Sequence, residues 1–209
     1  MSIENELKSG NIQDLKTKII AVTKTFPISE IKPLIDHGHL HYGENKVQEA
    51  LEKWNEIKKD VKNIKLHMIG KLQTNKVKFV VPLFDYIHSL DNLKLAQKIS
   101  LEQKKNNKKL KIFIQVNIGN EDQKSGIHQN EVMNFYKKCI NDLNLDIVGL
   151  MCIPPLRGDK NEYYKLMNDL NKSIGLDELS MGMSSDYLEA VKSNATFIRV
   201  GSLIFGKRG

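Results

Sequence analysis

The chain has 209 residues, of which 40% are hydrophobic and 27% charged, and its formal net charge is +7. This composition is typical of a soluble globular protein, and the longest apolar runs fall far short of the roughly 20 residues that a membrane-spanning helix needs. The first ten residues lack the basic start and apolar block of a secretory signal, and the two cysteines indicate reduced thiols, so we expect a cytoplasmic protein.

The positive charge is scattered along the chain. Its densest run, residues 104–109, contains no aromatic residue of the kind that stacks on single-stranded nucleic acid. A diffuse positive field also attracts small anions such as phosphate esters. The sequence therefore gives no reason to expect a specific nucleic-acid partner.

Short apolar runs alternate with segments of helical period along the chain. The eight expected strands are Ile19–Thr23, Leu40–Tyr42, Lys65–Ile69, Tyr86–Ser89, Lys111–Asn117, Asp146–Met151, Glu178–Ser180 and Phe197–Val200. The second and seventh have the weakest pattern, because they are short. Between the strands we expect amphipathic helices, whose apolar stripes are core packing.

Helix boundaries are predicted from capping residues. Ser29 is expected to cap the first helix and Gly38 to end it, with Pro33 tolerated because it lies near the helix start. Asp91 is expected to cap a later helix that contains Leu95.

Strict alternation of strand and helix predicts a parallel sheet in the α/β class. Eight units favour a closed (β/α)8 TIM barrel over a doubly wound open sheet. Because no internal linker is rich in Gly, Pro or Ser, we expect residues 1–209 to form a single domain. In such barrels, binding residues lie on the loops that follow the carboxyl ends of the strands.

Lys24 follows the first expected strand directly. If its side chain points into the barrel mouth, apolar walls and nearby cations favour the neutral amine, which can attack an aldehyde and form a Schiff base. A lysine at this position can also point to solvent.

The last two strand ends are rich in small residues. Gly182 and Gly201 allow close backbone approach, Ser184 and Ser202 add hydroxyl groups, and each cluster opens a helical segment whose positive end favours an anion. Loops after strands seven and eight commonly bind phosphate in this fold, although ordinary turns have the same composition.

Five further residues have competing interpretations. Arg199 is expected to face the mouth, or to form a structural salt bridge. His39 and His41, with His67, could begin a metal site, but no acidic or thiolate partner has the expected spacing, so we expect no metal. Cys152 is expected to be a buried filler, and no catalytic residue is assigned.

In combination, the strand ends resemble the pyridoxal-phosphate homeostasis protein family, whose barrel is similar to the N-terminal domain of alanine racemase. The resemblance runs from about Ile19 to Arg208. Its main stretches are residues 21–24, 43–45, 47–49, 67–70, 72–73, 75–76, 115–117, 124–126, 149–151, 179–184, 199–201 and 204–206.

The resemblance implies that Lys24 holds pyridoxal 5′-phosphate (PLP) as a Schiff base and that Ser184, Gly201 and Ser202 hold its phosphate. It places Arg199 beside the cofactor. An arginine near a pyridine nitrogen would disfavour the protonated ring on which most pyridoxal chemistry depends. The other cofactor-binding residues expected from the resemblance are Asn45, His67 and Met183.

The resemblance also implies a role in vitamin B6 homeostasis without a catalytic cycle. The expected partners are PLP and, as recipients, PLP-dependent enzymes that lack their cofactor; the expected oligomeric state is a monomer or weak dimer. Two departures from the family pattern are a shorter segment before the first strand and Lys71, where an uncharged residue is expected.

Two other functions remain open. The first is a PLP-dependent amino-acid racemase, which needs a second acid/base group. In racemases of this fold that group comes from an additional domain, for which only seven residues remain after Ser202. The second is a phosphate-handling barrel enzyme that uses no pyridoxal cofactor.

Overall fold

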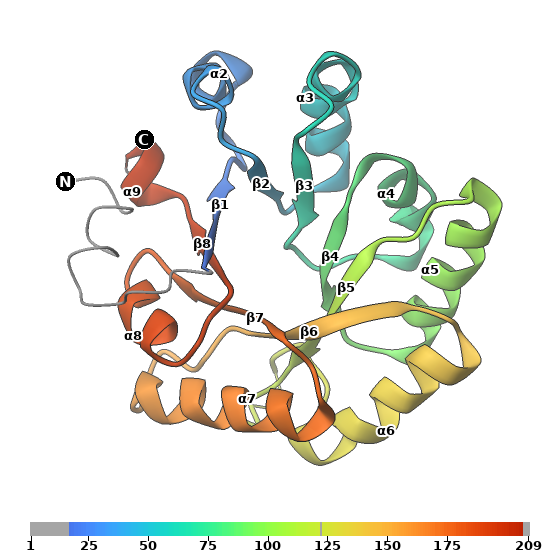
Figure 1. Cartoon of the computed structure of the whole chain (residues 1–209), viewed down its shortest axis with the longest axis vertical. Helices are drawn as coiled ribbons and strands as arrows, with labels where there is room; N and C mark the ends of the chain where they lie inside the picture. Colours follow the sequence, from blue (N-terminus) through green and yellow to red (C-terminus); the bar gives the residue numbers. More distant parts are fainter. Residues whose placement is uncertain (1–16, 122, 207–209) are drawn as a thin grey trace.

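The computed structural model describes residues 17–121 and 123–206 as a closed barrel of eight parallel strands, in sequence order (Figure 1). The strands are β1 (Lys18–Val22), β2 (His41–Glu44), β3 (Lys65–Met68), β4 (Tyr86–Leu90), β5 (Lys111–Val116), β6 (Asp146–Cys152), β7 (Glu178–Met183) and β8 (Phe197–Val200). The predicted α/β TIM-barrel fold is confirmed, and so is each of the eight strands.

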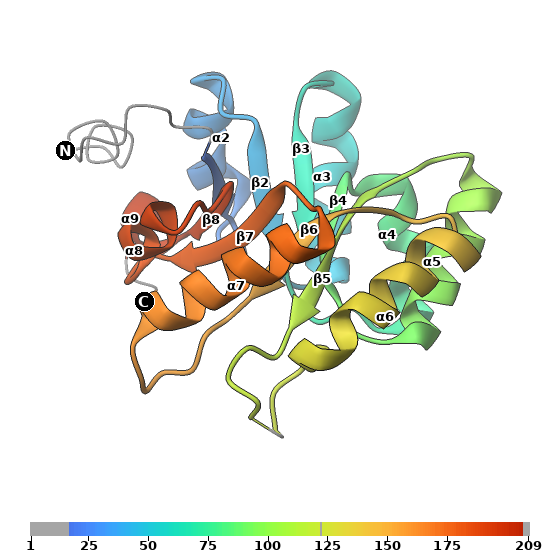
Figure 2. The same ribbon diagram turned by 60° about the horizontal axis from the view of Figure 1, so that its bottom comes forward.

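Helices surround the barrel on the outside (Figures 1 and 2). They are α2 (Ile28–Asp36), α3 (Val47–Asp60), α4 (Val77–Leu83), α5 (Leu93–Asn106), α6 (Val132–Lys137), α7 (Lys160–Ile174), α8 (Tyr187–Lys192) and α9 (Ser202–Phe205). Single helical turns at Thr74–Lys76 and Gln129–Glu131 precede α4 and α6, and a wide turn at Lys138–Asp142 extends α6. Within the described residues, no helix combines the length and the apolar character that crossing a membrane requires.

Two apolar layers hold this arrangement together. The larger lies between the strands and the helices and includes Trp54 of α3 and Tyr164 of α7, both fully buried. The smaller fills part of the barrel interior and contains Ile20, Tyr86, Phe113, Met151 and Phe197. The barrel is therefore a packed core, and its binding surface must lie at the strand ends.

Three of the helix-boundary predictions are corrected. Helix α2 starts at Ile28, after Pro27, whose ring presets an extended entry, so Ser29 lies inside the helix instead of capping it. Pro33 lies in the interior of α2, not near its start. Gly38, with a φ of +87°, ends the helix as predicted.

The third correction concerns α5. Its cap is Asn92, whose side-chain oxygen accepts a hydrogen bond from the Leu95 amide at 2.9 Å. Asp91 lies one residue too early to reach that amide and instead accepts a bond from the Asn92 side chain. The predicted shortening of the segment before β1 concerns residues that lie outside the described part of the chain.

Candidate functional site

A cavity of about 750 Å³ opens among the carboxyl ends of the strands. Residues from the ends of β1, β5, β7 and β8 and from the segments that follow β1, β2, β3, β5, β6, β7 and β8 line it. They are Val22, Lys24, Asn45, Ile69, Gly70, Lys71, Gln115, Val116, Asn117, Gln123, Lys124, Ser125, Ile153, Met183, Ser184, Ser185, Arg199, Gly201 and Ser202. The cavity therefore lies where a TIM barrel places its ligands.

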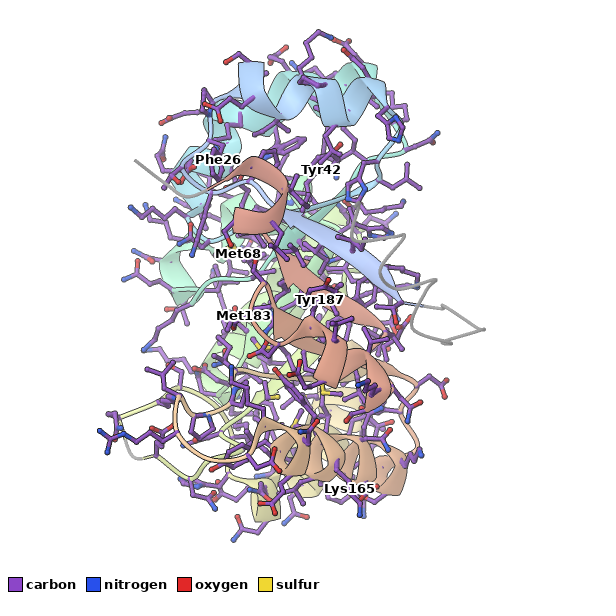
Figure 3. The ribbon with its side chains drawn as sticks, turned by 90° about the vertical axis from the view of Figure 1, so that its left-hand side faces the viewer. Phe26, Tyr42, Met68, Lys165, Met183 and Tyr187 are labelled. Carbon is purple, nitrogen blue, oxygen red and sulfur yellow. The ribbon has the colours of Figure 1, made fainter. Side chains whose placement is uncertain are left out.

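Most of the residues predicted to bind a cofactor lie together around this cavity. Seven of the eight predicted residues line it: Lys24, Asn45, Met183 (labelled in Figure 3), Ser184, Arg199, Gly201 and Ser202. They come from four different strand ends, so only the closed barrel brings them together. Their contact with a cofactor remains a prediction.

His67 is placed elsewhere. Its side chain is fully buried inside the barrel, stacked on Tyr86 at 4.2 Å between ring centroids, and it is not among the residues that line the cavity. The motif at residues 67–70 spans the end of β3, and this position suggests a binding residue. His67, however, is the third residue of β3 and points into the barrel, below the strand end. Its ring nitrogens bond to His41 and His88.

The backbone that carries Lys24 is held from behind by α3. Lys53 donates to the carbonyl of Thr23 at 2.7 Å, and the Thr25 amide donates to the Glu49 carboxylate. Thr25 has a φ of +71°, a left-handed conformation that a β-branched residue rarely adopts. These contacts fix the sharp turn that lets Lys24 reach the cavity.

Glu44, at the end of β2, anchors the same turn from inside the protein. One of its carboxylate oxygens accepts bonds from the Thr23 hydroxyl at 2.7 Å, the Trp54 indole at 3.0 Å and Lys53 at 3.2 Å. Burial raises the pKa of Glu44, although these donors oppose the rise. The carboxylate therefore supports the turn structurally and does not reach the cavity.

The turn between β7 and α8 is held by Asp186. Its carboxylate accepts from the Met183 amide at 2.7 Å and pairs with Lys160 at 2.6 Å. Gly182 enters this turn with a φ of +89°, and a Cβ there would lie 2.6 Å from Ala190. This packing places Ser184 and Ser185 on the cavity wall.

The turn after β8 brings Gly201 against β1. A Cβ at Gly201 would lie 3.3 Å from the Val22 carbonyl oxygen, so a larger residue would push the two strand ends apart. The short helix α9 that follows packs on Phe26, whose ring lies 4.7 Å from that of Phe205 (Figure 3). Ser202 is thereby held next to the turn that carries Lys24.

Arg199 forms the inner wall of the cavity. It is 6% exposed, and its guanidinium donates to the Ser180 hydroxyl at 2.8 Å and to the Cys152 carbonyl at 2.9 Å. Burial lowers its pKa from a value so high that the group stays charged at neutral pH. Within the described residues its bonds go to neutral oxygens, so the salt bridge considered as its alternative role is not formed.

The sequence reasoning did not assign one side of the cavity. Gln115, Asn117, Gln123, Lys124 and Ser125, from β5 and the loop after it, line that side. This connection projects at the bottom of Figure 2. The sequence signal for this side is the pair of stretches 115–117 and 124–126, which belong to the family resemblance.

The titratable side chains on the cavity wall are basic. In the described part of the chain they are Lys24, Lys71, Lys124 and Arg199. Cys152 is fully buried below the cavity, and burial raises the pKa of its thiol to about 12. Tyr164 is also fully buried, and burial raises its pKa. The wall thus favours anionic ligands, and its described residues include no carboxylate, histidine or thiol.

The fold and the site together define a TIM-barrel binding protein with a basic cavity that contains a lysine at the end of the first strand. The family model described as "Alanine racemase, N-terminal domain" matches residues 7–209. The pyridoxal phosphate homeostasis protein of Haemophilus influenzae is 35% identical over 99% of this chain and 91% of its own length.

Solved structures of two related proteins have the same fold as this chain. The structure of PipY from Synechococcus elongatus with PLP bound superimposes with a TM-score of 0.86 at 32% identity, over 98% of this chain and all of PipY. An alanine racemase from Clostridium difficile shares the fold at 17% identity, with a TM-score of 0.74 over 98% of this chain and 56% of the racemase. The chain belongs to the alanine racemase N-terminal domain family, and within it to the pyridoxal phosphate homeostasis proteins.

Proposed function

We propose that this protein binds PLP in the strand-end cavity, linked through the amine of Lys24, and acts in vitamin B6 homeostasis as a carrier or buffer of the cofactor. The observation that carries the proposal is the meeting of Lys24, Arg199 and the two serine-containing turns around one cavity. PipY, whose whole length matches this chain, has been solved with PLP bound, which supports the assignment of the ligand.

The residues on the cavity wall fit this cofactor. The cavity volume of about 750 Å³ is within the range of small-molecule sites. The side-chain oxygen of Asn45 is buried and has no hydrogen-bond partner among the described residues, so a ligand donor can satisfy it. When bound, PLP supplies an aldehyde that condenses with a neutral amine and releases water, and Lys24 is the amine placed at the first strand end.

The two turns after β7 and β8 suit the phosphate group. Ser184 and Ser202 offer hydroxyl donors, and Gly201 has no side chain that would keep an anion away from the backbone. The basic lining adds a favourable field for a phosphate dianion. We assign phosphate binding to these three residues.

Arg199 supports a carrier over a catalyst. A guanidinium cannot give up its proton, so it donates to a ring nitrogen and disfavours ring protonation. That weakens the electron withdrawal on which most pyridoxal reactions depend. No tyrosine or cysteine, the side chains that could serve as the second acid/base group of a racemase, is among the described residues that line the cavity.

The cellular setting follows from the same proposal. A buffer of this kind works in the cytoplasm, as a monomer or weak dimer, and its recipients are PLP-dependent enzymes that lack their cofactor.

The test is the visible absorption spectrum of the protein mixed with PLP, before and after borohydride reduction, followed by peptide mapping. We expect a visible band that reduction traps on the peptide containing Lys24. Lys24→Ala should lose the band, whereas Lys71→Ala, a control on the same cavity wall, should keep it. Absence of the band from the unmodified protein would contradict the proposal.

A second assay separates carrier from catalyst. Purified protein loaded with PLP is incubated with free amino acids, and the change in their enantiomeric ratio is followed. The carrier proposal expects no steady turnover. Sustained racemization that is lost in Lys24→Ala would instead establish an enzyme.

A further inference from the structure

A continuous chain of polar side chains runs through the otherwise apolar barrel interior. His41 contacts His67 at 2.9 Å between ring nitrogens, and His67 contacts His88 at 2.9 Å. His88 contacts the Ser180 hydroxyl at 2.8 Å, and that hydroxyl accepts from Arg199 at 2.8 Å. The chain thus ends at the guanidinium that lines the cavity.

Strand register explains how three histidines form one line. Gly43, two residues after His41, is the register partner of His67, and the partner of His67 on β4 is Tyr86, two residues before His88. Each successive histidine therefore lies two residues closer to the carboxyl ends of the strands. The line climbs from the half-buried His41 at the opposite end of the barrel to the cavity.

The three imidazoles are held in the neutral form. Burial lowers the pKa of His41 to about 4 and lowers those of His67 and His88 well below their usual value. His88 also stacks on Phe113 at 4.3 Å between ring centroids. A neutral imidazole has one donor and one acceptor nitrogen, so a line of them must point one way.

Arg199 and Ser180 together set that direction. A guanidinium only donates, and among the described residues the Ser180 hydroxyl bonds only to Arg199 and His88, so its own buried proton finds an acceptor only at Nδ1 of His88. The Ser180 hydroxyl accepts a hydrogen bond from Arg199 and donates one to Nδ1 of His88. Nε2–H of His88 then donates to Nδ1 of His67, and Nε2–H of His67 donates to Nδ1 of His41. Every acceptor end in the line faces the guanidinium.

We propose that His41, His67, His88 and Ser180 form a one-way hydrogen-bond line whose aligned dipoles stabilise and orient Arg199, so that its remaining N–H groups face the ring nitrogen of the cofactor. They are positioning residues, and the ligand in this statement rests on the function proposed above. The line replaces a carboxylate partner, which would neutralise the guanidinium and weaken its attraction for an electron-rich ligand atom.

The same geometry argues against a path for protons. Passing a proton along the line would require Arg199 to release or accept one, and a guanidinium does neither at neutral pH. The line is therefore fixed in one direction.

The first test needs no cofactor. Nitrogen-15 NMR of histidine side chains reports which ring nitrogen carries the proton, and we expect Nε2–H for His41, His67 and His88. His41→Phe should leave the other two unchanged, because the direction is set from Arg199. An Nδ1–H form of any of the three, or reversal of His67 and His88 in His41→Phe, would overturn the proposal.

The second test compares the affinity for PLP with the affinity for the analogue that has a carbon in place of the ring nitrogen. The preference for PLP should fall about tenfold in Ser180→Ala, the loss of one charge-assisted hydrogen bond. Should that variant not fold, His88→Phe, whose ring keeps the stacking on Phe113, replaces it. His37→Gln, at an exposed histidine, is the control.

These outcomes separate the two proposals. An unchanged preference in a folded Ser180→Ala or His88→Phe protein would overturn the positioning role while PLP binding stands. Failure of the unmodified protein to bind PLP would remove the proposed function, and the histidine protonation states would still decide whether the line exists.

Discussion

Lys53 donates to three acceptors: the Thr23 carbonyl and the carboxylates of Glu44 and Glu49. The side chains of Lys53 and Glu44 are 11% and 0% exposed. At such burial, removing one charge leaves its partner without compensation, which costs far more than breaking a surface ion pair. The lysine therefore stabilises both the fold and the turn that carries Lys24.

We expect Lys53→Met to lower the free energy of unfolding by about 3 kcal/mol. The Lys24 turn would also loosen, so PLP affinity should fall in the same variant. Urea denaturation and PLP titration measure the two effects. Lys59→Met, on the same helix but in an exposed pair with Glu56, should change neither measurably, and equal effects of the two substitutions would refute this account.

Gly182 provides a second prediction for a single residue. The Cβ of an alanine there would lie 2.6 Å from the Cβ of Ala190, and the backbone would keep an unfavourable positive φ. Gly182→Ala should therefore lower the free energy of unfolding by about 3 kcal/mol. It should also weaken PLP binding, because the turn that carries Ser184 is displaced. At Gly175, φ is also positive but nothing lies within 4 Å of the added methyl group. Gly175→Ala should therefore lower the free energy of unfolding by only about 1 kcal/mol. Urea denaturation of both variants separates the effect of steric crowding at Gly182 from the effect of backbone strain, which the two positions share.

Among the secondary-structure elements, α5 shows how one residue decides where a helix starts. The Asn92 side chain accepts a hydrogen bond from the Leu95 amide, which has no partner within the helix. A side chain at position 91 lies too early in the chain to reach this amide. We expect Asn92→Ala to lower the free energy of unfolding by about 1 kcal/mol, measured by urea denaturation. Asp91→Ala should cost less than half as much, and the reverse order would show that the cap is Asp91.

The sequence predicted most strands well because they are rich in apolar residues and are followed by polar turns; Phe197–Val200 matches to the residue. The weak strands around Tyr42 and Ser180 proved longer than predicted, because pairing with neighbours on both sides extends them. Local pattern cannot report that effect, which depends on residues far away in the chain.

The cavity was predictable for a similar reason, and the histidine line was not. Lys24 and Gly201 lie at strand ends, which a TIM barrel always gathers on one face. The contacts of His67 depend on the relative stagger of β2, β3 and β4, and the sequence alone does not specify that stagger. The sequence therefore suggests only a metal site for His39 and His41, with His67 as a third ligand, and it gives no role to His88.

At the scale of the whole molecule, the buried histidines make the fold sensitive to acid. For His41, burial lowers the folded pKa to about 4, helped by His39, Lys18 and Lys65 and opposed by Asp85. A lowered folded pKa means that the unfolded chain binds more protons. The resulting stability is fully present above pH 6.5 and is lost as the pH falls through about 4.

We expect the urea midpoint to fall as the pH is lowered from 7 to 4.5. His41→Gln removes one titrating group and keeps a hydrogen-bond acceptor, so its midpoint should fall less steeply. His37→Gln, at an exposed histidine, should retain the full slope. A midpoint that does not change with pH in the unmodified protein would contradict the assignment of neutral, buried imidazoles.

The barrel closes by pairing its first strand with its last, from Lys18 beside Phe197 to Ala21 beside Val200. During synthesis on the ribosome, β1 therefore cannot pair with β8 until β8 has been synthesised. Lys24 and Ser202 lie on the two sides of that final seam. A nascent chain can therefore complete the proposed cofactor site only after β8 has been synthesised, and capture of the cofactor would mark the closure of the barrel during biosynthesis.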